Sequence, residues 1–242
     1  MNKGKISAMI FAAGLGTRLY PLTSDRPKAL VEIGGTTLLE LTIRKLIDAD
    51  LHHIVINVHH FGEKIIDFIE KHHFDADIAI SDEREALLDT GGGLKFADPL
   101  FQNSENILLY NVDILTDLDL HALLNFHCSH EALATLAVRQ RETSRYFLFD
   151  TNEGRLCGWR NRQNGEERIA SPSNQYKELA FSGIHVVNKK IFDLIPTCEK
   201  KSITPIYLDL APTQKILAYE HSDGEWCDVG KLEVVKKLNG EL

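Results

Sequence analysis

The sequence predicts an α/β fold, in which helices cover both faces of a mixed, mostly parallel sheet in three layers. Two observations predict this fold. Short apolar runs rich in β-branched residues alternate with amphipathic helical patterns through the first 140 residues, as in parallel sheets that carry helices on both faces. After Arg141 the chain changes to hairpin-like and polar segments, which we expect to form a smaller lobe on the same sheet.

The expected elements of the first half follow one another in alternating order. Residues 6–12 form a buried apolar run that ends in a glycine-rich turn, and residues 54–58 form a second, β-branched run. The apolar spacing predicts helices over residues 37–49 and 62–72. Further strands are expected at residues 78–80, 107–110 and 132–138, and a helix is expected to begin near Asp119 and continue through Leu124.

The second half is expected to be less regular. Residues 146–149 and 155–159 are predicted to form a β-hairpin across a turn at residues 151–154. The polar stretch 161–177 is predicted to be a long mobile loop. A strand is expected at residues 179–187 and helices at 189–195 and 205–210. We expect residues 1–242 to form one domain.

Composition and charge exclude several classes of protein. Hydrophobic residues make up 43% of the 242-residue chain and charged residues 26%, which is typical of a soluble globular protein. A net charge of −8 argues against nucleic-acid binding, which usually requires a basic surface. No stretch approaches the length of a membrane span, so we expect no membrane contact.

The cysteines and the N-terminal segment bear on the cellular compartment. The four cysteines lie far apart, so no zinc pattern is present and free thiols are expected. The first residues imitate a secretory signal, but their apolar run ends in the glycine-rich turn, which cleavage would damage. We therefore expect a cytoplasmic protein, either a monomer or a small homo-oligomer.

The most informative segment is FAAGLGTRLYPLTSDRPKAL at residues 11–30. Gly14 and Gly16 let backbone N–H groups approach a ligand closely and adopt φ > 0 where needed. Outward-facing amides together with Arg18 and Lys28 predict a cradle for a polyphosphate.

Two familiar phosphate loops are excluded by spacing. No glycine is followed at the required distance by Gly-Lys-Ser/Thr, so the segment is not a Walker A loop. Leu19 stands where a dinucleotide fingerprint needs its third glycine, which argues against a nicotinamide oxidoreductase.

Three candidate site residues share a position relative to the predicted strands. Gly14, Asn57 and Asp113 all lie at the carboxyl ends of such strands. Ligands of open α/β sheets bind outside the carboxyl ends of the strands. We therefore expect these residues to converge on one crevice.

Several motifs, in order along the chain, resemble those of the sugar-nucleotide pyrophosphorylases, the nucleotidyltransferases that join a sugar 1-phosphate to a nucleoside triphosphate. The opening G-x-G-x-R, followed by PLT at 21–23 and PK at 27–28, resembles their first motif. The later matches are DTGGG at 89–93, NVD at 111–113, FSGI at 181–184 and WCDVG at 226–230. The resemblance covers nearly the whole chain.

The resemblance implies a Rossmann-like fold of the nucleotide-diphospho-sugar transferase type. Residues 1–140 are then the nucleotide-binding half, and residues 141–242 hold the sugar-binding lobe and the second metal carboxylate. The implied reaction is in-line attack of the sugar phosphate on the α-phosphorus, and Lys28, Arg18 and Asp113 are implied to be catalytic. Asp113 and Asp228 are implied to bind Mg²⁺, which prefers oxygen ligands.

The same resemblance assigns further residues to the two substrates. Glu83 or Glu85 is implied to bond the base or the ribose. Relatives that act on common hexose 1-phosphates hold the sugar phosphate with the lysine of a Glu-Lys-Pro segment. This chain has GWRN at 158–161 instead, so Arg160 or Arg162 is expected to replace that lysine. The expected nucleotide contacts are Ala12, Ala13, Gly14, Gly16, Thr17, Arg18, Asn57, Glu83, Thr90, Gly91 and Gly92, and the expected sugar contacts are Asn111, Gly183 and Arg160.

The resemblance is strongest to short members of the family and leaves the substrates open. It favours UTP with N-acetylmuramate 1-phosphate, followed by guanylyl transfer to mannose or heptose 1-phosphate. A non-catalytic nucleotide-sugar-binding regulator is the main alternative class. The presence of Arg18, Lys28, Asp113 and Asp228 together argues against it, because a binding module has little need of all four. Cytidylyl transfer to phosphocholine would need a cage for the quaternary amine, for which Trp159 and Tyr176 are the hints.

Overall fold

The computed structural model describes residues 5–241, so the beginning of the signal-like segment lies outside the described residues. Four parallel strands form the centre of the sheet, in the spatial order β6-β1-β4-β5. They are β1 (Ile6–Phe11), β4 (His53–Val58), β5 (Asp77–Asp82) and β6 (Asn106–Asn111). Strand β1 is buried on both faces, as expected of a central parallel strand.

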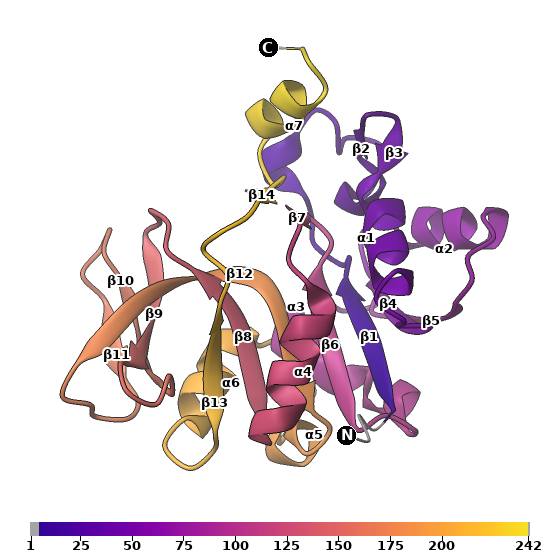
Figure 1. Ribbon diagram of the computed structural model, residues 1–242. Coiled ribbons are helices and arrows are strands. Elements are labelled where there is room, and N and C mark those ends of the chain that lie inside the picture. The colour runs from indigo at the N-terminus through magenta and orange to yellow at the C-terminus, as the bar shows by residue number, and fades with distance from the viewer. Residues whose placement is uncertain (1–4, 242) are drawn as a thin grey trace.

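The long strand β12 (Tyr176–Asn188) joins this parallel part to the rest of the ten-stranded sheet. It pairs antiparallel with β6, with β8 (Ala134–Arg139) and with β9 (Arg145–Asp150). Beyond these lie β13 (Ile216–Glu220), β10 (Leu156–Asn161) and β11 (Glu167–Ile169). Strands β9, β10 and β11 curl away from the parallel part, on the side of the molecule opposite α2 (Figure 1).

Helices cover both faces of the sheet and close two apolar cores. One face carries α1 (Leu38–Ile47), α2 (Gly62–Lys71), α4 (Leu120–His130) and α7 (Leu232–Leu238). The other carries α3 (Asp89–Phe96), α5 (Ile191–Leu194) and α6 (Ile203–Leu210). Alternate residues of β1 enter the two cores, Ile10 one and Met9 the other. The predicted three-layer α/β fold is confirmed.

The expectations fail mainly in short or late elements. The stretch 161–177 is not one loop, because β11 pairs within it against β10 and its last residues begin β12. The two-stranded sheets β2 (Glu32–Ile33) with β3 (Thr36–Thr37), and β7 (Ile114–Thr116) with β14 (Trp226–Asp228), have no counterpart among the predicted elements. Strands of two or three residues are too short for a periodic pattern to reveal.

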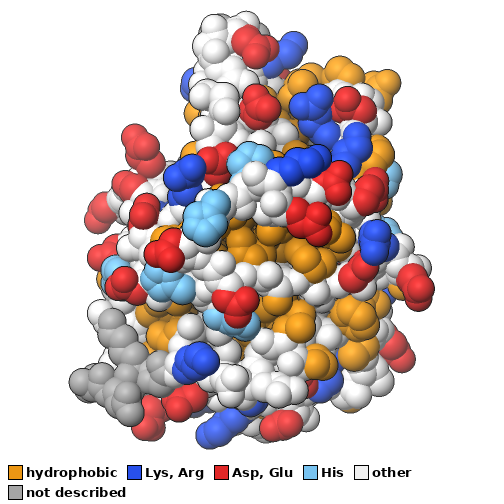
Figure 2. Space-filling view, turned by 90° about the vertical axis from the view of Figure 1, so that its right-hand side faces the viewer, with side chains coloured by type: hydrophobic (Ala, Val, Ile, Leu, Met, Phe, Trp, Pro, Cys, Tyr) orange, Lys and Arg blue, Asp and Glu red, His pale blue; other side chains and the backbone are white. Residues whose placement is uncertain are grey.

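The outer surface carries both apolar and charged side chains. Apolar side chains gather in the middle of the face that carries α2 and the edge strand β5, and acidic and basic side chains are interspersed around them (Figure 2). Among residues 5–241, no helix is both long and apolar enough to cross a bilayer. The four cysteines form no disulfide within that range.

Candidate active site

The two glycines of the loop after β1 play different roles. Gly16 has a φ of +64°, where a side chain is strained, and a Cβ there would lie 3.0 Å from Cγ2 of Thr23. Gly14 lies outside that region, and its Cβ would lie 3.6 Å from Nζ of Lys28, an ordinary contact distance. The backbone therefore requires glycine at position 16, whereas Gly14 leaves space beside an ammonium group.

A buried asparagine and glutamate fix the start of this loop. Oδ1 of Asn57 accepts hydrogen bonds from the N–H groups of Ala12 at 2.7 Å and Ala13 at 3.2 Å. Nδ2 of Asn57 donates to Oε1 of Glu83 at 2.8 Å. Burial raises the pKa of Glu83, and the hydrogen bond from Asn57 opposes that shift. Glu85 is exposed, so the structure separates the two acids and gives Glu83 the buried position.

The backbone N–H groups that are free to bind a ligand come later in the loop than Ala12 and Ala13, the first expected nucleotide contacts. The N–H groups of Ala12 and Ala13 are used inside the protein, where they bond Asn57. Within residues 5–241, the N–H groups of Gly14, Leu15 and Gly16 make no hydrogen bond. These amides are therefore the loop donors that a phosphate group can use.

Lys28 and Asp113 meet at the carboxyl edge of the sheet. Lys28 begins the 3₁₀ helix η2 (Lys28–Leu30), and its Nζ lies 2.8 Å from Oδ2 of Asp113, which follows β6. The exposed fractions of these side chains are 15% and 11%, so water screens their charges only weakly. Two motifs that are distant in the sequence thus form one ion pair.

Arg18 and Asp228 come from opposite ends of the sequence to the same place. The N–H of Val229 donates to the backbone oxygen of Asp113 at 2.8 Å, which sets Asp228 beside Asp113. A Cβ on Gly230 would lie 2.6 Å from both Nη2 of Arg18 and Oδ1 of Asp228. Within the described residues, the guanidinium of Arg18 makes no hydrogen bond or ion pair. It is an exposed cation at the rim of the site, next to Thr17 in η1 (Thr17–Leu19).

Lys28, Asp113, Gly14 and Asn57 line one cavity of about 330 Å³. Its lining includes three residues that the sequence reasoning missed, Phe11, Leu87 and Asp89. Asp89 belongs to the DTGGG motif, which signals its presence, whereas Phe11 and Leu87 are apolar and carry no chemical signal. The full lining consists of Phe11, Ala13, Gly14, Lys28, Asn57, Leu87, Asp89, Thr90, Asn111 and Asp113.

The DTGGG segment opens α3, and its glycines face protein. The N–H groups of Gly91 and Gly92 both donate to the backbone oxygen of Lys201, at 2.8 and 3.0 Å. A Cβ on Gly92 would lie 2.3 Å from the backbone oxygen of Glu199. Both glycines are buried against that segment, while Thr90 lines the cavity. Contact of Gly91 and Gly92 with a nucleotide stays a prediction.

The expected sugar-side residues do not all come together. Asn111 lines the cavity, and a Cβ on Gly183, whose φ is +79°, would lie 3.1 Å from Nδ2 of Asn111. Arg160 lies on β10 and forms ion pairs with Glu167 and Glu178. The structure therefore joins Asn111 and Gly183 to the cavity and leaves Arg160 paired within the curled strands.

The carboxylates suit a hard cation that a substrate also holds. Oδ2 of Asp113 pairs with Lys28 and Oδ1 of Asp228 accepts the N–H of Gly230, so each carboxylate keeps one oxygen without such a bond. Among the described residues, no group of three or more His, Cys, Asp or Glu is placed to hold a metal. Two carboxylates fit Mg²⁺, which keeps several waters and takes its other ligands from substrate phosphates.

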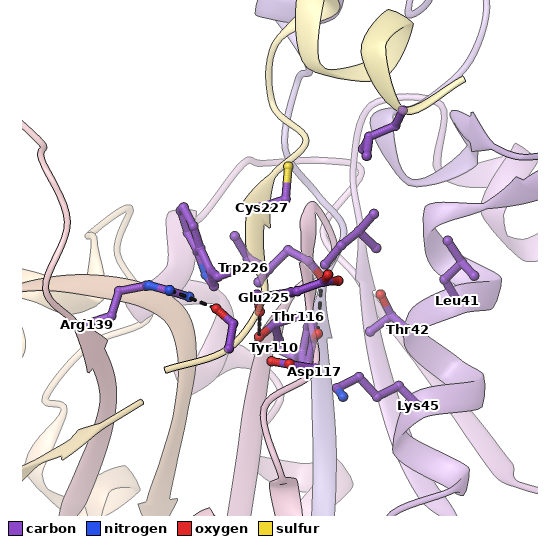
Figure 3. Close-up of a pocket in the computed structure, with 14 residues that line it drawn as sticks. Leu41, Thr42, Lys45, Tyr110, Thr116, Asp117, Arg139, Glu225, Trp226 and Cys227 are labelled. Carbon is purple, nitrogen blue, oxygen red and sulfur yellow. Dashed lines mark hydrogen bonds between the residues drawn. The ribbon is translucent and has the colours of Figure 1, made fainter. Parts of the chain in front are cut away.

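A larger hollow, of about 780 Å³, lies between α1 and the β7–β14 pair (Figure 3). Lys45 extends into it from α1, and Trp226 and Cys227 border it from β14. Burial lowers the pKa of Lys45, while nearby Asp117 opposes that shift. The lining contains neither Lys28 nor a predicted metal carboxylate, so the chemical groups gather in the smaller cavity.

An open α/β sheet with free loop amides, two cations and two carboxylates at its carboxyl edge is typical of proteins that bind nucleotides. Comparison with known families identifies the family. The chain belongs to the nucleotidyl transferase family, whose model matches residues 7–241. The resemblance inferred from the motifs is confirmed.

Curated relatives carry two different substrate names. N-acetylmuramate α-1-phosphate uridylyltransferase of Caulobacter vibrioides is 41% identical over 120 residues, which are 47% of this chain and 48% of that protein. Mannose-1-phosphate guanyltransferase of Pichia angusta is 30% identical over 233 residues, which are 93% of this chain and 61% of that protein. The matched regions thus span about half to three-fifths of these relatives.

Solved structures share the fold at low sequence identity. UDP-glucose pyrophosphorylase from Acinetobacter baumanii superimposes with a TM-score of 0.78 at 18% identity, over 97% of this chain and 92% of that one. HddC from Yersinia pseudotuberculosis, complexed with GMP-PN, gives a TM-score of 0.73 at 22% identity, over 97% and 98%. These likenesses show the fold.

Proposed function

We propose that this protein transfers a nucleotidyl group from a nucleoside triphosphate to a sugar 1-phosphate, releasing pyrophosphate. The observation that carries the proposal is the ion pair of Lys28 with Asp113 at the cavity, together with Arg18 and Asp228, which both lie close to Gly230. Family membership over residues 7–241 supports it. A protein that merely stored a nucleotide would need fewer charged groups.

The proposed chemistry is a single displacement at phosphorus. A phosphate oxygen of the sugar 1-phosphate forms a bond to the α-phosphorus, and the bond from that phosphorus to the oxygen bridging to the β-phosphate breaks. Pyrophosphate leaves with the electron pair of that bond. Lys28 neutralises charge on the α-phosphate, and Arg18 with the free amides of Gly14 and Gly16 holds the leaving phosphates.

Asp113 and Asp228 would hold Mg²⁺, which supplies charge neutralisation and fixes the two phosphate groups relative to each other when bound. Lys28 keeps Asp113 in place through their ion pair, and the N–H of Gly230 orients Asp228. The protein contributes positioning and charge, because phosphoryl-type transfer requires little proton movement.

UTP and N-acetylmuramate 1-phosphate are the first proposed substrates. The relative that carries this name has the higher identity, 41%, though over 120 residues. GTP with mannose 1-phosphate is the second candidate, because mannose-1-phosphate guanyltransferases match 93% of the chain. We place the reaction in the cytoplasm, where nucleoside triphosphates are made and used.

A matrix of substrates tests the proposal. Pyrophosphate release is measured in Mg²⁺ with each of four nucleoside triphosphates against N-acetylmuramate, mannose and heptose 1-phosphates, and controls omit one substrate or add a chelator. We expect pyrophosphate release from the pair of UTP and N-acetylmuramate 1-phosphate, and we expect this release to require both substrates and the metal. Silence in every cell, with nucleotide binding intact, would contradict the proposal and favour a nucleotide-sugar-binding regulator.

A further inference from the structure

Arg141 is a half-buried arginine with an unused donor near the site. It follows β8, and its Nη2 donates to the backbone oxygen of Phe181 at 3.1 Å. Its guanidinium carbon lies 4.3 Å from the ring centroid of Trp226, a cation–π distance. Its Nε is buried and has no hydrogen-bond partner within the described residues. A buried unpaired guanidinium N–H is costly unless a ligand satisfies it.

The position of Arg141 points to the sugar side. Trp226 and Asp228 are two residues apart on β14, so their side chains lie on the same face of that strand. Nε1 of Trp226 donates to the backbone oxygen of Ser182 at 2.9 Å. Arg141 and Trp226 thus bond the two residues that precede Gly183, the glycine that faces Asn111.

The charges around Arg141 favour an anion. Burial lowers the pKa of Arg141, Asp228 opposes that shift, and the neighbouring Arg139 adds to it. In Figure 3 the side chain of Trp226 lies between Arg139 and β14. Nη2 of Arg139 donates to the backbone oxygen of Gly224. A doubly charged phosphate beside Arg141 would relieve the repulsion between the two arginines.

The proposed reaction needs one more cation than the phosphate loop provides. Lys28 pairs with Asp113, and Lys28 and Arg18 serve the triphosphate. The second substrate is also a phosphate ester and needs its own positive group. Arg160 and Arg162 do not meet that need, because Glu167 and Glu178 neutralise them.

We propose that Arg141 binds the phosphate group of the sugar 1-phosphate, on the side of the site where Gly183 faces Asn111. This assignment rests on the proposed function. The forked guanidinium suits two phosphate oxygens, and its contact with the indole of Trp226 limits its movement. Arg141 thereby replaces the lysine that the sequence resemblance leaves without a counterpart.

Steady-state kinetics provide the first test. In Arg141→Gln, the KM for the sugar 1-phosphate is expected to rise about 10- to 100-fold, as for one lost charge-assisted hydrogen bond, while the KM for the triphosphate changes less than about threefold. Arg141→Lys should recover part of the loss. Arg168→Gln is the matched control, since Arg168, on β11, pairs with the exposed Asp209 of α6.

Two kinetic outcomes would overturn the assignment. Equal changes in both KM values, or a lowered melting temperature with an unchanged KM for the sugar phosphate, would give Arg141 a structural role that supports β14. An increase in that KM in Arg160→Gln, with none in Arg141→Gln, would return the role to Arg160.

Binding without turnover separates this proposal from the proposed function. In a Trp159→Phe background, the emission of Trp226 is followed during titration with mannose 1-phosphate and N-acetylmuramate 1-phosphate, without triphosphate or metal, and with the unphosphorylated sugars as controls. We expect a saturable change with a phosphorylated sugar alone, weakened at least tenfold by Arg141→Gln. Identical saturation curves with and without Arg141, or no saturable change, would overturn it.

The two proposals fail in different experiments. Arg141-dependent binding of the sugar phosphate without pyrophosphate release from any substrate pair would reject the proposed reaction and keep the binding role. Normal pyrophosphate release with sugar-phosphate binding indifferent to Arg141 would reject the binding role and keep the reaction.

Discussion

The two ends of strand β6 carry polar clusters of opposite kinds. At its amino end, Oδ1 of Asn106 faces Nε2 of His127 at 3.2 Å, and Nδ1 of His127 faces the hydroxyl of Thr135 at 2.8 Å. Nδ2 of Asn188 also donates to Asn106. At the carboxyl end, the strand leads into Asp113, beside Lys28 and the free guanidinium of Arg18.

Hydrogen-bond satisfaction distinguishes these clusters. His127 is 1% exposed, and burial lowers its pKa to about 4, so it is neutral at pH 7, with Nε2–H donating to Asn106 and Nδ1 accepting from Thr135. This cluster uses both ring nitrogens and contains no net charge. The carboxyl end keeps charged groups and loop amides unpaired, which favours a ligand. Buried polarity whose hydrogen bonds are satisfied therefore does not mark a functional site.

The largest expected effect is at the carboxyl end. Asp113→Asn keeps an acceptor for Lys28 but removes the charge that would bind the metal, so pyrophosphate release should fall about 10³-fold, consistent with the several kcal/mol that a metal supplies. The melting temperature should shift by less than about 4 °C, equivalent to roughly 1 kcal/mol. Asp117→Asn is the control, because Asp117 borders the larger hollow. Retained turnover in Asp113→Asn would show that the carboxyl end of β6 does not carry the reaction.

The opposite pattern is expected at the amino end. His127→Ala removes the side-chain partner of Thr135 and one of the partners of Asn106, and it opens a cavity. The free energy of unfolding should therefore fall by about 2–4 kcal/mol. Urea denaturation measures this loss, and kcat under folded conditions should remain within about twofold. A large drop in kcat with unchanged stability would show that the two ends are coupled.

The two loop glycines, Gly14 and Gly16, are expected to separate an effect on turnover from an effect on stability. Gly14→Ala fits the backbone but places a methyl group beside Lys28, so kcat/KM for the triphosphate should fall about 10-fold. Gly16→Ala strains a left-handed residue and should cost about 1–2 kcal/mol of stability. Thermal melts and kinetics on both variants give the result, and equal losses of stability would remove the distinction.

The smallest expected effect is the change of stability with pH that His127 causes. The pKa of His127 is lowered from its ordinary 6.5 to about 4 in the folded protein. Its contribution to stability is therefore fully present above pH 6.5 and is lost as the pH falls towards 4, by at most about 1.4 kcal/mol per pH unit. We expect the stability advantage of wild type over His127→Gln to shrink over this window. A constant difference between the two unfolding curves would show that His127 does not titrate as a buried neutral group.

The sequence predicts what short-range chemistry controls. The glycine loop and the alternating elements are predicted correctly, because glycine turns and periodic apolar runs are local features. The metal-binding role of Asp113 and Asp228 comes from the family resemblance and stays a prediction. The rule that the carboxyl ends of parallel strands meet at one edge brings Asp113 near Gly14 and Asn57. The rule does not predict the ion pair of Asp113 with Lys28, because Lys28 lies in η2 and not at a strand end. The prediction that Gly14, Asn57 and Asp113 share a crevice is confirmed, since all three line the cavity.

The remaining site geometry depends on partners that are distant in the sequence. The sequence shows no sign that the oxygen of Lys201 takes the amides of Gly91 and Gly92, because that contact forms only when α6 packs on α3. Arg160 stands at the place of the missing Glu-Lys-Pro segment, but the acids that neutralise it lie on β11 and β12. Arg141 is one of several arginines in its segment, and its stacking on Trp226 reveals it.

The pairing of β14 with β7 has a consequence for synthesis on the ribosome. Arg18, Lys28 and Asp113 belong to the earlier part of the chain, but Asp228 joins them only when β14 has been made and has paired with β7. A nascent or truncated chain that stops before Trp226 can hold the phosphate loop without the second carboxylate. Catalytic competence is therefore expected to appear late and all at once, so that incomplete copies do not consume nucleoside triphosphate.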